Sequence, residues 1–171
     1  MQNEDSPPLY ELLNQIVGAA QNGYHLLALS MAVALPDICV SLSSEDGRST
    51  GERYKEWCKK NLPSSQFNFV TGEDLWSMRC GVLHNGRFGD LKHNVARVLF
   101  SLPGGVSFTN CKLNDAYIYG VLEFCKNICD AAYNWYGQND KDPIILNNSK
   151  KMMRYHLNGF PPYTVGMPVI G

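Results

Sequence analysis

Arg79 and His84 are separated by four residues in the segment 79–84 (RCGVLH), and they are the side chains in this sequence best suited to chemistry. A guanidinium binds anions, and an imidazole accepts or donates a proton near neutral pH. The pair could therefore bind an anion and transfer a proton to or from it. Asn85 and Arg87 follow directly and are candidates for binding the substrate.

Arg79 lies within the apolar face of the helix that this segment is predicted to form. At 100° per residue, that face is made by Leu75, Met78, Val82 and Leu83. An unpaired guanidinium is very costly to bury, so two arrangements are acceptable. Either the guanidinium pairs with a carboxylate inside the fold, or it lines a cleft or subunit interface that binds anions. An acidic residue such as Asp37, Asp74 or Glu123 could pair with it.

His84 lies at the end of the same predicted helix, next to its last carbonyl groups. The negative end of the helix dipole favours a protonated imidazole there, and the alternative is a histidine that only bonds those carbonyl groups. In a regular helix Arg79 and His84 point about 140° apart. They can form one site only if the last helical turn loosens or if a second chain completes the site.

Helical periodicity predicts the elements that precede this pair. Apolar residues recur at helical spacing over residues 9–20, which indicates an amphipathic helix. The next run, residues 24–42, is apolar on nearly every face and is typical of a helix at the centre of a bundle. Pro36 predicts a kink or a restart within that run. A short helix follows, with Ser49 and Glu52 as its predicted capping box.

The helix that carries Arg79 has clear predicted ends. Thr71 and Asp74 form a capping box before its first turn, and Gly86 is the signal that closes it. Farther along, two β-rich runs flank a Pro-Gly-Gly turn. These runs predict one small β-hairpin near residues 95–109.

The rest of the sequence, from residue 114 onward, completes the prediction of an all-α fold. A long helix is predicted over residues 114–136, with Gly137 as its stop. Residues 138–171 are polar and then rich in glycine and proline, so we expect an extended C-terminal tail. The fold class is therefore all-α, a helical bundle of about five helices with one small hairpin. A length of 171 residues fits a single domain, residues 1–171.

The composition is that of an ordinary globular protein. Hydrophobic residues make up 44% of the chain, charged residues 18%, and the formal net charge is −1, so no overall field attracts nucleic acid or acidic lipid. The six cysteines include no CxxC pair, which favours reduced thiols and a cytoplasmic location. We expect no metal and no cofactor. The apolar run from Leu26 to Leu35 is too short to span a bilayer, so no membrane association is expected.

The segment 75–88 (LWSMRCGVLHNGRF) follows an apolar helix pair and precedes another long helix, and it resembles the Rx4-6H segment of HEPN-domain proteins. The similarity extends over about residues 8–137, and residues 75–87 carry its specific part. The resemblance implies an HEPN-like helical bundle, usually a homodimer in which two Arg/His pairs face each other across the interface. The residue after the arginine is often polar in the family, whereas here it is Cys80.

The resemblance also implies a function. Many HEPN proteins are metal-independent endoribonucleases, often toxins or defence effectors, and others only bind a nucleotide or a protein partner. Carried over, Arg79 would stabilise charge on the scissile phosphate, and His84 would act as general base or acid while the RNA 2′-OH attacks. We therefore expect a metal-independent endoribonuclease that acts on RNA as a homodimer and has a cognate antitoxin. A non-catalytic module that binds a nucleotide or a protein partner is the alternative.

Overall fold

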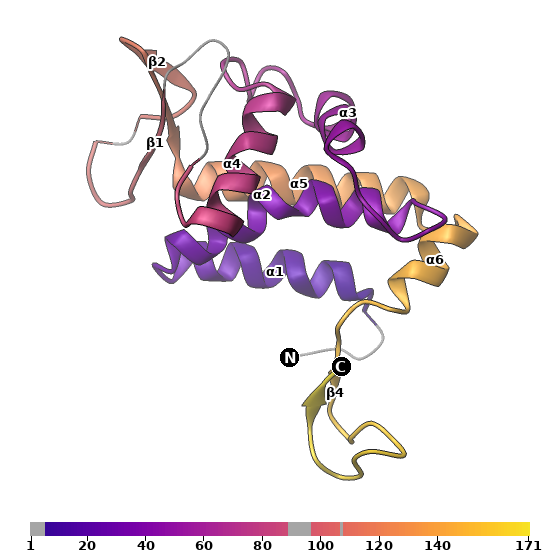
Figure 1. Cartoon of the computed structure of the whole chain (residues 1–171). Coiled ribbons are helices and arrows are strands. Elements are labelled where there is room, and N and C mark those ends of the chain that lie inside the picture. Colours follow the sequence, from indigo (N-terminus) through magenta and orange to yellow (C-terminus); the bar gives the residue numbers. More distant parts are fainter. Residues whose placement is uncertain (1–5, 89–96, 107) are drawn as a thin grey trace.

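The computed structural model describes residues 6–88, 97–106 and 108–171 and shows a helical bundle with a small sheet at one end (Figure 1). The described residues form six helices, and the expectation of a mainly helical fold is confirmed. The helices are α1 (Pro8–Gln21), α2 (His25–Leu42), α3 (Gly51–Asn61), α4 (Gly72–Asn85), α5 (Val121–Asn139) and α6 (Pro143–Ser149).

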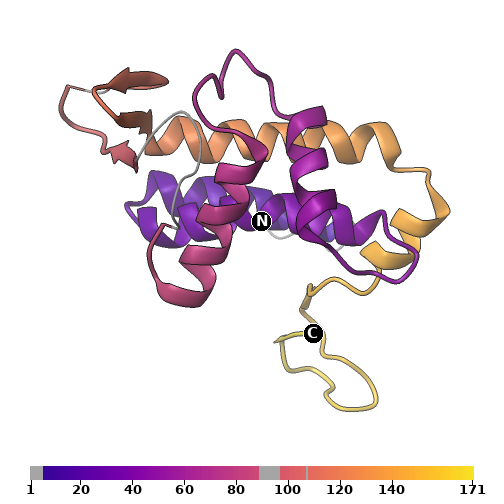
Figure 2. The same cartoon turned by 45° about the horizontal axis from the view of Figure 1, so that its top comes forward.

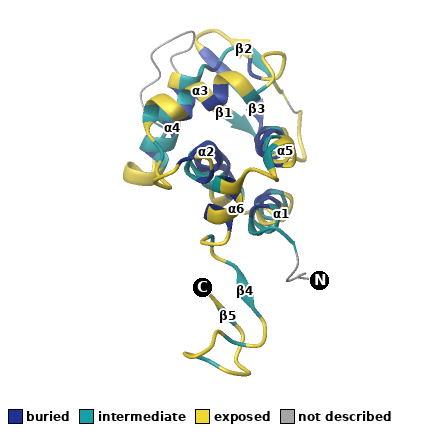
Figure 3. Cartoon of the chain, turned by 90° about the vertical axis from the view of Figure 1, so that its right-hand side faces the viewer, coloured by how far each residue is buried: buried dark blue, intermediate teal, exposed yellow. Residues whose placement is uncertain are grey.

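Helix α2 lies at the centre of the bundle, as its apolar pattern predicted. Viewed from one end, α1 and α5 pack on one side of α2, while α3 and α4 lie on the other (Figure 3). Figure 2 shows α4 crossing the long helices instead of running along them. Because α2 contacts neighbours on most sides, residues around its whole circumference are buried. This position explains why α2 lacks a polar face.

Helix α2 is also long and apolar enough to cross a membrane, with 18 residues and a mean hydropathy of 1.8. The prediction that the apolar run was too short for a bilayer was therefore wrong, because the helix continues through Pro36 to Leu42. In the fold, however, 56% of this helix is buried by its neighbours. Helix α2 therefore serves here as the core helix of a bundle, and the cytoplasmic location stays a prediction.

Pro36 lies inside α2 without ending the helix, so the predicted restart does not occur. Proline lacks an N–H group and cannot bond a carbonyl in the preceding turn. The carbonyl that Pro36 leaves without a helical donor is that of Ala32, and the hydroxyl of Tyr54 in α3 donates a 2.8 Å hydrogen bond to the next carbonyl, that of Val33. Because Tyr54 is fully buried, this bond supplies a polar partner inside the core and fixes α3 against α2.

The ends of α4 follow the predicted local signals. The Asp74 N–H donates to Thr71 Oγ1 at 3.3 Å, and the Thr71 N–H donates to Asp74 Oδ2 at 3.0 Å, which completes the capping box. Gly86 closes the helix with a φ of 65°, a conformation that favours glycine. At α3 the cap is Thr50 instead of Ser49, whose hydroxyl bonds a side chain of α2.

Residues 95, 96 and 107 lie outside the described residues, and among the described residues of the range 95–109 the predicted β-hairpin is not formed. Strand β1 (Arg97–Ser101) pairs in parallel with strand β3 (Ala116–Gly120), and strand β2 (Cys111–Leu113) pairs with β3 in antiparallel fashion. The sheet therefore has the order β1-β3-β2. The hairpin that does form joins β2 to β3, and Asn114 in its turn has a φ of 53°, which asparagine tolerates better than most residues.

Helix α5 begins at Val121, later than the predicted start at residue 114, because β3 occupies the intervening residues. Ala116 and Tyr117 are adjacent in β3, so they face opposite sides of the sheet, and both are buried; this strand therefore lacks the alternation that marks a strand with one solvent face. Periodicity alone cannot separate such a short apolar run from a helix. Gly137 does not end α5 either, since a glycine inside a helix costs only about 1 kcal/mol.

The range predicted to be an extended tail is partly folded onto the bundle. Helix α6 packs against α2 and buries Ile145. After it, strands β4 (Tyr155–His156) and β5 (Val169–Ile170) pair in an antiparallel hairpin. This hairpin projects from the bundle (Figures 1 and 3), and we call residues 154–171 the C-terminal arm.

Candidate functional site

Helices α2 and α4 bring Arg79 against Asp37. The Arg79 Nε atom lies 2.5 Å from Asp37 Oδ2, and the two side chains are 23% and 13% exposed. Ser49 Oγ donates a 2.6 Å hydrogen bond to the other carboxylate oxygen, Oδ1. Of the two arrangements expected for a guanidinium on an apolar face, Arg79 adopts the ion pair. Its partner is Asp37, and not Asp74 or Glu123.

The rest of the Arg79 guanidinium is held by weaker contacts. Its central carbon lies 5.1 Å from the centre of the Trp76 ring, a cation–π distance. Its Nη1 atom lies 4.0 Å from the sulfur of Cys80. Within the described residues, no oxygen atom accepts a hydrogen bond from the two terminal nitrogens. The guanidinium is therefore anchored through Nε, and its fork of Nη donors keeps its capacity for another oxygen ligand.

Arg79 lines an open hollow of about 730 Å³ between α2, α4, the segment before α3 and the end of α6. Two other cationic side chains, Arg48 and Lys151, also line this hollow. Its carboxylates are Asp37 and Asp46. Three cations against two carboxylates leave a formal charge of +1, so the hollow is locally positive on a chain whose net charge is −1.

Asn148 connects α6 to the end of α2 on one side of this hollow. Its Nδ2 group lies 3.4, 3.1 and 2.8 Å from the carbonyl oxygens of Ser41, Leu42 and Ser44, at and just beyond the end of α2. Its Oδ1 atom accepts a 3.2 Å hydrogen bond from Lys151 Nζ. Asn148 therefore both docks α6 and positions a lysine at the hollow.

His84 does not join Arg79 within one chain. Helix α4 is helical through Asn85, so its last turn does not loosen, and His84 is exposed. Asn85 and Arg87 are exposed as well, and among the residues described around the hollow none of these three contributes to its lining. The structure thus separates the predicted catalytic and substrate-binding residues into Arg79 at the hollow and the others at the end of α4.

Sequence reasoning missed most of the residues around Arg79. Ser49 was assigned to a helix cap and Trp76 was given no role at the site, whereas both line the hollow. Lys151 and Asn148 lie more than 60 residues from Arg79 and fall in the range predicted to be a tail. Short-range patterns carry no signal for such contacts, because they depend on how α6 docks onto α2.

The cysteines are a separate group of chemically active side chains. Cys39, Cys58, Cys125 and Cys129 are buried free thiols. Burial raises the pKa of Cys125 and Cys129 to about 12 and also raises the pKa of the other two. In the part of the chain that the structure describes, no group of three His, Cys, Asp or Glu side chains could hold a metal ion. These thiols therefore act as core residues.

Native thiol reactivity should follow this burial. At pH 8 we expect iodoacetamide to modify Cys80 and Cys111, which are partly exposed, and to leave Cys125 and Cys129 unmodified. A thiol with a pKa of about 12 is protonated at that pH, so roughly one molecule in ten thousand carries the reactive thiolate. Mass spectrometry of tryptic peptides measures the labelling, and all six thiols should react in urea. Rapid labelling of Cys125 in the folded protein would contradict the structure.

No protein-family model, no curated protein and no solved structure matches the chain. The resemblance to HEPN proteins therefore stays an expectation from the sequence segment 75–88. The geometry itself offers two features for a functional argument. One is the hollow beside Arg79, and the other is the exposed end of α4 with His84.

Proposed function

We propose that the chain is a non-catalytic binding module that holds the phosphate group of a nucleotide in the hollow beside Arg79. One observation carries this proposal. Asp37 holds Arg79 through Nε, while within the described residues the terminal nitrogens have no oxygen partner. A guanidinium anchored in this way still offers a planar fork of N–H donors that matches two phosphate oxygens. Its ion pair with Asp37 thus orients it for a ligand.

The surroundings of Arg79 support an anionic ligand. The Trp76 ring beside the guanidinium restrains its plane, and Ser49 restrains the carboxylate that holds it. Lys151 and Arg48 are exposed at the same hollow and supply two more cationic groups. A phosphate ligand would offset the excess positive charge there, which favours binding over the empty state.

Binding of nucleotides tests this proposal. We expect ATP and AMP to bind the full chain in isothermal titration calorimetry, and adenosine to bind at least tenfold more weakly. Arg79→Lys keeps a charge for Asp37 but loses the fork, so it should weaken ATP binding about tenfold. Arg87→Lys is the matched control at an exposed arginine and should leave binding unchanged.

Two results would exclude nucleotide binding at this hollow. The first is that neither ATP nor AMP binds to a protein whose circular dichroism is that of a folded helical chain. The second is that ATP binds equally well to wild type, Arg79→Lys and Lys151→Gln. Lys151 is exposed, so its replacement tests the hollow without disturbing the ion pair of Arg79.

A metal-independent endoribonuclease, acting on RNA as a toxin or defence effector, is the second candidate. The exposure of His84 favours it, since an imidazole on a free helix end is accessible to a large substrate. This function requires a homodimer, because one chain separates its own Arg79 from its own His84. A cognate antitoxin would then cover the exposed end of α4.

Cleavage of RNA in the absence of metal ions is the measurement that tests the ribonuclease candidate. A mixed RNA pool is incubated with the protein in EDTA, and the ends of the products are analysed. Cleavage by wild type that leaves 2′,3′-cyclic phosphate ends, and that falls about 100-fold or more in His84→Ala, would support it. His84 is exposed, so its loss should not unfold the chain. Absence of cleavage at high protein concentration, where a dimer would form, would exclude this candidate.

A further inference from the structure

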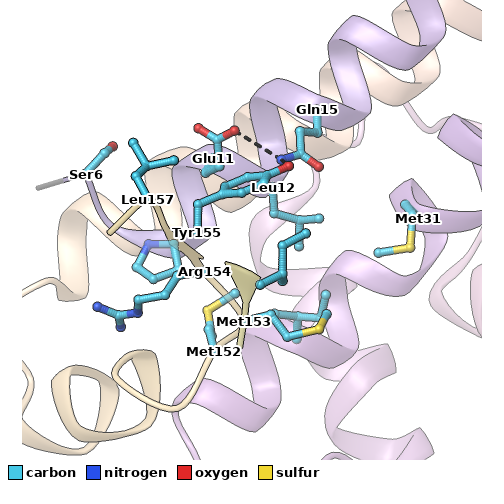
Figure 4. Close-up of a pocket in the computed structure, with 13 residues that line it drawn as sticks. Ser6, Glu11, Leu12, Gln15, Met31, Met152, Met153, Arg154, Tyr155 and Leu157 are labelled. Carbon is cyan, nitrogen blue, oxygen red and sulfur yellow. Dashed lines mark hydrogen bonds between the residues drawn. The ribbon is translucent and has the colours of Figure 1, made fainter. Parts of the chain in front are cut away.

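A second pocket lies between α1, α2 and the C-terminal arm, next to the hollow beside Arg79 (Figure 4). Its volume of about 460 Å³ falls within the range of small-molecule sites. Leu12, Met31, Ile38 and Met152 form its wall, and each is partly buried and packed against the core. Methionine thioethers adapt to flexible apolar ligands, so this wall suits an alkyl chain.

Polar groups connect the arm to α1 along one edge of this pocket. The Gln15 amide Nε2 donates hydrogen bonds to Glu11 Oε1 at 3.0 Å and to the Tyr155 hydroxyl at 3.2 Å (Figure 4). Both hydrogens of that amide are then used, and the Glu11 carboxylate has a donor. The Tyr155 hydroxyl accepts in this arrangement and keeps its own hydrogen for a ligand.

Arg154 supplies positive charge at the end of the pocket where α1 begins, near Ser6 (Figure 4). Its Nη2 atom donates to the Ser149 carbonyl at 3.2 Å, and within the described ranges no carboxylate pairs with it. The positive end of the α1 dipole lies at the same end of the pocket. Glu11, in the first turn of α1, lines the same pocket and offsets part of this positive charge, and its carboxylate accepts from Gln15. An anionic group is therefore favoured beside Arg154 itself and not elsewhere along the pocket.

We infer that this pocket binds a medium-chain fatty acid, with its alkyl chain against the methionine wall and its carboxylate at Arg154. The chain length follows from the volume. At about 30 Å³ per small group the pocket holds at most about 15 groups, so a chain of roughly 8–12 carbons fits. The charge of the head group follows from Arg154 and the helix dipole, and the Tyr155 hydroxyl can donate a hydrogen bond to the same carboxylate.

This site is separate from the hollow beside Arg79, although the two share the side chains of Ile38 and Met152 as a common wall. Arg154 and the arm do not line that hollow as the structure describes it. The test of fatty-acid binding therefore does not depend on whether the chain binds a nucleotide. A variant of Arg154 should not change binding of ATP, which keeps the two tests distinguishable.

Decanoate is the probe that tests this inference, at concentrations below those at which it forms micelles. Carboxyl-labelled decanoate followed by 13C NMR on the full chain should show saturable binding to one site. The affinity should rise about two- to fourfold for each methylene from hexanoate to decanoate, because each buries more apolar surface. Arg154→Gln should weaken decanoate binding about tenfold and leave decan-1-ol binding unchanged. Arg97→Gln, at an exposed arginine on β1, is the matched control.

A second pair of variants tests the location of the chain. Met31→Trp should fill the pocket and abolish decanoate binding, whereas Met167→Trp, at a methionine that is 55% exposed on the arm, should not. Absence of saturable binding would overturn the inference, as would equal binding by Met31→Trp and wild type. A change of oligomeric state in Met31→Trp without decanoate binding to wild type would also overturn it, since the pocket would then be a protein interface.

Discussion

Alanine in place of Asp37 is expected to lower the free energy of unfolding by about 2–3 kcal/mol. The substitution leaves the Arg79 guanidinium without its carboxylate at a position where its side chain is only 23% exposed. It also removes the acceptor of the Ser49 hydroxyl. Loss of one partner of a fully buried ion pair costs about 3–5 kcal/mol, and the residual solvent contact of this pair lowers the expected value.

Urea unfolding followed by far-ultraviolet circular dichroism measures this effect. Lys126→Ala breaks an exposed ion pair with Asp130, in which the side chains are 63% and 52% exposed, and it should cost less than about 0.5 kcal/mol. Adding Arg79→Leu to Asp37→Ala should restore part of the lost stability, because the unpaired charge is then removed from an apolar face. Equal stability of Asp37→Ala and Lys126→Ala would show that the Arg79 pair is solvated instead of partly buried.

Alanine in place of Phe124 should have the largest effect on stability, about 3–5 kcal/mol. Phe124 is fully buried at the start of α5, where the helical bundle meets the sheet. Its ring lies 4.9 Å from that of Phe100, 5.3 Å from that of Tyr119 and 5.9 Å from that of Phe67. Removing it opens a cavity among three aromatic side chains from three separate segments, which cannot all move to fill it.

The matched control is Phe108→Ala. Phe108 is 54% exposed, so its truncation removes little buried surface and should cost less than about 1 kcal/mol. Both variants are compared with wild type in the same urea titrations, with the slope of the transition recorded as a check on two-state behaviour. Similar losses at the two positions would mean that the bundle and the sheet do not share the core described here.

Local sequence signals predicted the helices of this protein well. The capping box of Thr71 and Asp74 and the glycine closure at Gly86 depend on residues within one turn of each other, and both are present. The apolar pattern of residues 24–42 predicted a central helix, which α2 is. These features could be predicted because helix formation and capping are governed by near neighbours along the chain.

Strand pairing could not be predicted in the same way. Arg97 in β1 pairs with Ala116 in β3, and the intervening chain contains a Pro-Gly-Gly turn that suggested a different partner. A turn signal reports where the chain can reverse, but the partner of a strand is chosen by the packing of the whole sheet. The residues around the hollow could not be predicted from the sequence either. Lys151 and Asn148 lie at the hollow because α6 docks on α2.

By itself the sequence determined that Arg79 would lie on an apolar helix face and would need either a carboxylate or an anion. That conclusion depends only on helix periodicity and on the cost of burying a charge. Only the tertiary structure decided which carboxylate pairs with Arg79, because that depends on how α4 crosses α2. His84 lies elsewhere because α4 stays helical through Asn85, so the angle between the two side chains follows from helix periodicity. The crossing follows from the combined packing of α2, α3 and α4, and no short segment contains that information.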